Sequence, residues 1–172
     1  MKRNLLALLL IVTTPLWASE VRELTWSEMI PADAPPPPPP AAIHDLSQLS
    51  DALAAESGPA ATQQSPAAPV VEALDSQEVK LPGYIVPLDV TEEGRVTEFL
   101  LVPYFGACIH VPPPPSNQIV HVTSELGVRM DALYQPFWIE GPLQVKPISS
   151  ELAEAGYQME ASKIYPYETP TN

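Results

Sequence analysis

Proline is the residue that most limits what this chain can fold into. The 172 residues include 23 prolines, and six of them form one run at 35–40. Proline lacks a backbone N–H and has a fixed φ, so it is excluded from helix interiors and from central strands. We therefore expect an extended polyproline spacer at 35–40 and a low-complexity linker at 58–69. Both stretches precede Lys80, which places the folding unit at residues 79–168.

The chain before that unit is expected to have three parts. Residues 1–18 have the basic start, short apolar run and break of a secretory signal peptide, with cleavage after Ala18. The alternative is an uncleaved N-terminal anchor. Residues 19–33 form an N-terminal segment that packs on the domain, because Trp26 is costly to leave in water. Residues 34–78 form a Pro/Ala-rich linker with a short amphipathic helix at 43–56.

A signal peptide implies export, so we expect a periplasmic protein without stable membrane insertion after cleavage. The formal net charge of −13 argues against nucleic-acid binding, because an acidic surface repels phosphate backbones. The single cysteine cannot form an internal disulfide, so the domain must rely on packing.

The pattern of the folding unit is that of short strands. Apolar and β-branched runs separated by turn residues predict strands at 79–90, 96–104, 108–111, 118–124, 134–139, 143–145 and 157–164. Pro82 and Pro87 restrict the first of these to an edge or a bent strand, with the bend at Gly83. Residues 150–155 are expected to form a helical turn, and 169–172 a tail. We therefore predict a mainly β fold, a small antiparallel OB-like β-barrel with a short helix.

The stretch 102–122 holds the densest potential chemistry. Cys108 and His110 are two residues apart, so on a strand they would share one face, and His121 could join them from a neighbouring strand. A thiolate with imidazoles suits zinc or copper(I), although two ligands alone seldom hold zinc tightly. The alternative is that Cys108 is a small buried apolar residue and His110 donates to a loop carbonyl.

The same stretch could form a ligand or partner surface. This candidate surface consists of Tyr104, Phe105, Pro112, Pro113, Pro114, Pro115, Asn117 and Gln118. The four prolines make an extended wall without backbone donors, beside which Asn117 and Gln118 can satisfy carbonyl groups. The alternative is a rigid connection between two strands, with Tyr104 and Phe105 in the core.

Several strings of the chain resemble one bacterial family. They are LPGYIVPL, EFLLVPYFGACIHVPPPPSNQIV, FWIEGPLQV and AGYQMEASKIYPYE, with LTWSEMIP near the expected mature N-terminus. Together they are similar to the exported family catalogued as domain of unknown function 3299. The resemblance implies export and a setting beside ABC-type transporters in zinc-responsive gene clusters, but no transferable activity.

These observations predict an exported, non-enzymatic accessory or binding protein of the bacterial cell envelope, linked to zinc and to a transporter component. One alternative is a protein-interaction module that uses its polyproline segments without a small ligand. Another is a thiol-dependent enzyme, with Cys108 as nucleophile, His110 or His121 as base and Asn117 as orienter.

Overall fold

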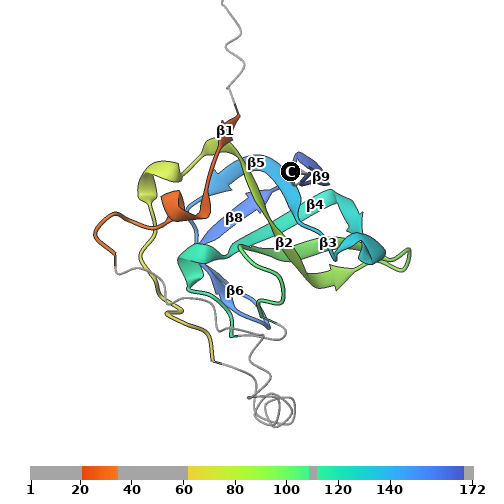
Figure 1. Ribbon diagram of the computed structural model, residues 1–172, viewed down its shortest axis with the longest axis horizontal. Coiled ribbons are helices and arrows are strands. Elements are labelled where there is room, and N and C mark those ends of the chain that lie inside the picture. Colours follow the sequence, from red (N-terminus) through yellow and green to blue (C-terminus); the bar gives the residue numbers. More distant parts are fainter. Residues whose placement is uncertain (1–20, 35–61, 109–111, 169–172) are drawn as a thin grey trace, which may run out of the picture.

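The computed structural model describes residues 21–34, 62–108 and 112–168 (Figure 1). The expected signal peptide 1–18, the helix 43–56, the tail 169–172 and His110 lie outside these ranges. In chain order the elements, with η for a short 3-10 helix, are β1 (Arg22–Glu23), η1 (Trp26–Met29), η3 (Glu72–Leu74), β2 (Gln77–Val90), β3 (Arg95–Val102), η4 (Ser116–Gln118), β4 (Val120–Arg129), η5 (Met130–Ala132), β5 (Phe137–Gln144), β6 (Ile148–Ser149), β7 (Glu154–Ala155), β8 (Tyr157–Glu160) and β9 (Lys163–Pro166).

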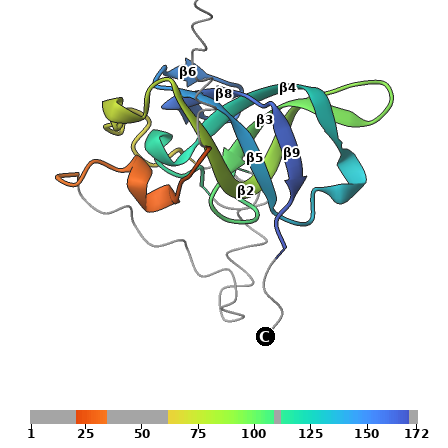
Figure 2. The ribbon, with the colours of Figure 1, turned by 90° about the horizontal axis from the view of Figure 1, so that it is seen from above.

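Five strands pair in a closed ring (Figures 1 and 2). The order is β2, β3, β4, β8 and β5, and β5 pairs with β2 again, while β1 adds to β2 and β9 to β5. The predicted mainly β class is confirmed, and five strands is the number found in an OB fold. The ring is not wholly antiparallel, however, because β4 and β8 run parallel.

The ring closes because the long strand β2 changes partner along its length. Residues 77–83 pair with β5, and residues from Tyr84 onward pair with β3. A Cβ at Gly83 would lie 2.8 Å from the Val102 carbonyl oxygen, so only glycine fits at this change. The prolines restricted this segment to an edge strand or a bent strand, and β2 is therefore the bent strand.

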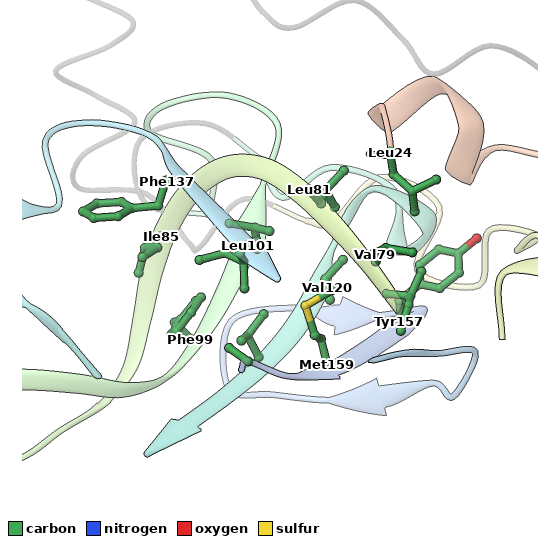
Figure 3. Packing of buried hydrophobic residues seen from close by; sticks show 14 of the residues in the cluster. Leu24, Val79, Leu81, Ile85, Phe99, Leu101, Val120, Phe137, Tyr157 and Met159 are labelled. Carbon is green, nitrogen blue, oxygen red and sulfur yellow. The ribbon is translucent and has the colours of Figure 1, made fainter. Parts of the chain in front are cut away.

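The inside of the ring is the main hydrophobic core (Figure 3). Alternate residues of each strand supply it, such as Phe99 and Leu101 from β3, and Val120 and Val122 from β4. Tyr157 and Met159, two residues apart on β8, also lie inside.

A second cluster covers the outer face of β2 and β3. It consists of Val86, Leu100, Val102, Ala107, Ile119, Ala153 and Ala155. Leu100 of β3 points away from the main core and is nevertheless fully buried. The outer cluster thus anchors the loop after β3 and the β6–β7 pair against the ring.

Two segments outside the predicted folding unit are packed onto the ring. Residues 21–34 bury Leu24 and Met29 in the main core. The Trp26 indole N–H donates to the Pro82 carbonyl at 2.7 Å. The Tyr157 hydroxyl joins both segments, since it donates to the Met29 carbonyl and accepts from the Val71 N–H, each at 2.8 Å. The described part of the expected linker, from residue 62, therefore belongs to the folded body.

Three local predictions need correction. Cys108 lies in a turn with φ of 65°, so a strand does not begin there, and residues 109–111 fall outside the described ranges. Residues 137–144 form the single strand β5 rather than two strands, because Gly141 lets Glu160 of the neighbouring chain segment approach closely. Residues 150–155 form no helical turn, because Ile148 and Ser149 pair with Ala155 and Glu154.

Candidate functional site

A hollow of about 480 Å³ lies on the outer face of β3 and β4, next to β6. Small-molecule sites commonly have volumes of about 300–1,000 Å³, so its size is that of a ligand site. The residues that line it are Leu88, Glu98, His121, Ile148, Ser149, Ser150 and Glu151. They come from β2, β3, β4 and the β6–β7 region, which only the folded ring brings together.

His121 is held within this hollow by a carboxylate. His121 lies opposite Leu100 in the β3–β4 register, and Glu98 is two residues before Leu100. Glu98 and His121 therefore project from the same outer face as diagonal neighbours. Their side chains meet with Nε2 of His121 2.8 Å from Oε1 of Glu98. The imidazole is 7% exposed and the Glu98 side chain 44% exposed, so the pair links the buried wall of the hollow to solvent.

The sequence pattern did not single out Glu98 as a site residue. The signal was the alternation of β3, in which Phe99 and Leu101 face the core and Glu98 and Leu100 face outward. That pattern, combined with His121 facing away from Val120 and Val122, could have indicated the pair. The β3–β4 register was still needed to show that they are neighbours.

Cys108 lies in the loop after β3, half-buried against the outer cluster. Burial raises the pKa of its thiol to about 11, so the sulfur is a neutral thiol near pH 7. A neutral, half-buried thiol is a poor nucleophile. His110, the other predicted ligand next to Cys108, lies outside the described residues.

The predicted zinc ligands are thus placed only in part. His121 already bonds to Glu98, as a zinc-bound histidine does to its supporting carboxylate. Within 21–34, 62–108 and 112–168, no three His, Cys, Asp or Glu side chains are grouped as metal ligands.

The proline run forms an internal strap. Pro113, Pro114 and Pro115 are buried, and Pro112 is half-buried. The Pro113 carbonyl accepts from the Gln64 N–H at 3.1 Å, and the Pro114 carbonyl accepts from Gln63 Nε2 at 3.0 Å. The segment that was expected to be a linker therefore covers the proline wall.

Asn117 and Gln118 are also directed inward. Asn117 Nδ2 donates to the Pro69 carbonyl at 2.7 Å, and Gln118 Nε2 donates to the Trp26 carbonyl at 2.9 Å. Both side chains satisfy carbonyl groups, as expected, but these belong to the two packed segments rather than to the proline run.

The aromatic pair Tyr104 and Phe105 lies in the loop after β3. Phe105 is 57% exposed and meets Tyr84 edge to face, with ring centroids 5.7 Å apart. Tyr104 is half-buried against the outer cluster. Of the residues predicted as a partner surface, Phe105 is the most accessible.

Comparison with known proteins gives a family. The family described as "Protein of unknown function (DUF3299)" matches residues 26–166. The chain belongs to the DUF3299 family. It is also similar to the crystal structure of a DUF3299 family protein from Pseudomonas aeruginosa PAO1, with 65% sequence identity and a TM-score of 0.77. The similarity covers 88% of this chain and 99% of that chain.

No curated protein matches the chain. Among the described residues, no helix has the length and apolar character needed to cross a membrane. The family resemblance predicted from the sequence strings is confirmed, and the description of that family names no activity.

Proposed function

We propose that this DUF3299 protein is an exported, non-enzymatic accessory protein of the bacterial cell envelope that acts by binding a ligand or partner in the hollow beside His121. The observation that carries the proposal is the Glu98–His121 pair, which sets a buried imidazole in the wall of a hollow of ligand size. Export is supported by the signal-like residues 1–18 of the sequence.

The state of Cys108 supports a role without catalysis by the thiol. Nucleophilic cysteine chemistry requires a thiolate, and a pKa of about 11 keeps this sulfur protonated at neutral pH. The two serines of the hollow are also engaged elsewhere. Ser149 Oγ bonds to Glu154 Oε1 at 2.5 Å, and Ser150 Oγ bonds to the Ala153 carbonyl at 2.7 Å. Neither hydroxyl is bonded to His121 as a triad would require.

The partner implied by the family resemblance is a component of an ABC-type transporter. A photo-crosslinking residue placed at Glu151, in the hollow, tests this in living cells, with the same residue at exposed Glu92 as the matched control. We expect a periplasmic protein that crosslinks to the transporter component from position 151 and not from position 92. A cytoplasmic location, or equal crosslinking from both positions, would contradict the proposal.

The zinc version of the proposal places the metal at Cys108, His110 and His121. Calorimetric titration with zinc should compare the unchanged protein with Cys108→Ser and His110→Ala. Tight binding that both substitutions abolish supports the zinc site, because each removes one ligand. Equally weak binding in all three proteins removes zinc from the proposal and leaves the hollow as the binding site.

The burial of Pro113–Pro115 weighs against the alternative of an interaction module built on this proline run. Grooves that recognise polyproline require an accessible helix of that type.

A further inference from the structure

The hollow beside His121 has an unusual balance of polar groups. Among the side chains that line it in the described part of the chain, two are glutamates, two are serines, one is a histidine and none is Lys or Arg. This balance narrows the chemistry of the ligand, and the inference drawn from it rests on the proposed binding role of the hollow.

The hydrogen bond to Glu98 decides which nitrogen of His121 is available. An ionised carboxylate only accepts hydrogen bonds, so Nε2 of His121 must carry the donated proton. In the neutral ring, Nδ1 then holds a lone pair. No described residue forms a hydrogen bond with Nδ1. Nδ1 is also not among the fully buried side-chain atoms of the described residues that lack a hydrogen-bond partner. The His121 side chain is 7% exposed and lines the hollow, so the exposed part of its ring is accessible to a ligand there.

Neither serine hydroxyl of the hollow offers a donor, and Ser149 adds an acceptor. Ser149 directs its hydroxyl toward the Glu154 carboxylate, and Ser150 donates to the Ala153 carbonyl. With its proton committed, the Ser149 oxygen offers only its lone pairs to a ligand, whereas the Ser150 oxygen already accepts from the Leu152 and Ala153 N–H groups. Glu151 is exposed at the same hollow and contributes a negative charge. The side chains therefore suit a ligand that donates hydrogen bonds and carries positive charge.

The walls are apolar. Leu88 and Ile148 line the hollow and pack against the outer hydrophobic cluster. Methylene groups can lie against such walls while a charged end group reaches the acceptors. We propose that the hollow binds a protonated primary amine on an aliphatic chain, with its N–H groups directed to His121 Nδ1 and to the carboxylates of Glu98 and Glu151.

An inorganic cation fits this arrangement less well. A tightly held metal ion needs three or more protein ligands in a fixed geometry. The described parts of the chain contain no such group of His, Cys, Asp and Glu side chains. An ammonium group needs only acceptors and can keep part of its hydration.

The test is calorimetric titration of the purified protein with 1,5-diaminopentane, with 1,5-pentanediol as the uncharged counterpart. The diamine should bind and the diol should not. Glu151→Gln should weaken binding by about fivefold through loss of one partly screened charge. His121→Gln should weaken it by at least about tenfold, through loss of a hydrogen bond to a charged group. Glu92→Gln removes the same charge at an exposed turn and should leave binding unchanged.

Several results would overturn this inference. They are binding of the diol as tightly as the diamine, equal effects of the Glu92 and Glu151 substitutions, absence of binding by both the diamine and N-acetyl-lysine methylamide, and saturation of the hollow by zinc or calcium alone. Since His121→Gln could disturb packing, the exposed Glu151→Gln variant decides the outcome if His121→Gln unfolds at a lower temperature. Titration with N-acetyl-lysine methylamide separates the sources, because binding of the lysine derivative alone indicates a protein partner and binding of the diamine alone a free amine. The crosslinking test can succeed when these titrations fail, so the two proposals are separable.

Discussion

Replacing Tyr157 with phenylalanine should cost this protein more stability than the loss of one hydroxyl normally does. The side chain is fully buried, and burial raises the pKa of its phenol, which stays protonated. Its oxygen donates to the Met29 carbonyl and accepts from the Val71 N–H, both at 2.8 Å. Phenylalanine would retain the ring and leave two backbone groups without partners.

The magnitude follows from those two groups. Each unsatisfied buried group costs about 1–3 kcal/mol, so we expect Tyr157→Phe to lower the free energy of unfolding by about 2–3 kcal/mol in total, allowing for partial access of water at Val71. With a urea slope of about 1–3 kcal/mol per molar, the unfolding midpoint should fall by about 0.7–3 M. Tyr134→Phe removes the same hydroxyl from a side chain that is 74% exposed and should change little.

Amide exchange supplies a second measurement. The Val71 N–H should exchange faster in Tyr157→Phe, because its acceptor is gone. A midpoint equal to that of Tyr134→Phe, together with unchanged exchange at Val71, would refute the reasoning that Tyr157 joins the two packed segments to the ring.

Three further predictions concern other parts of the fold. Hydrogen bonds from Lys163 and Tyr165 lower the pKa of Glu140, so its carboxylate should add stability at neutral pH that is lost as pH falls through its folded pKa. The difference in unfolding free energy between the unchanged protein and Glu140→Gln should therefore shrink below about pH 4. A difference that does not change with pH would contradict this. Burial raises the pKa of Cys108 from 9.0 to about 11. Iodoacetamide at pH 7.5 should therefore alkylate Cys108 about 100-fold more slowly in the folded protein than in the protein unfolded by denaturant. Equal alkylation rates in the two states would contradict this prediction. Gly83→Ala should lower the free energy of unfolding by about 2 kcal/mol or more, because the new Cβ would lie 2.8 Å from the Val102 carbonyl oxygen. A urea titration measures this, and an unchanged midpoint would show that β2 and β3 shift freely to make room.

The strand-level predictions succeeded where side-chain alternation was the signal. Val120 and Val122 face the core while Ile119 faces the outer cluster, as period-two alternation requires. Gly94 in the turn after β2 has φ of 73°, a left-handed conformation that glycine adopts readily. The two strands predicted around Gly141 are one because glycine here marks a close approach between chain segments, which the sequence pattern does not distinguish from a turn.

The candidate site was predictable only in its parts. His121 was predicted as a metal ligand, but its observed partner Glu98 comes from the strand before it. Cys108 and His110 were adjacent enough to suggest a site, yet Cys108 has a left-handed backbone and packs on apolar side chains. Spacing along the chain therefore did not indicate Glu98, and Cys108 as a metal ligand stays a prediction.

The sequence alone was sufficient for the β class, the acidic character and the family strings, because alternation, charge and motif are local properties of the chain. Only the tertiary structure decided which segments belong to the folded body and which side chains share a surface. The Tyr157 hydroxyl joins residues 29 and 71, and the hollow gathers residues from 88 to 151, through pairings far apart in sequence. Such contacts depend on ring closure and strand register, and these are set by the packing of the whole core.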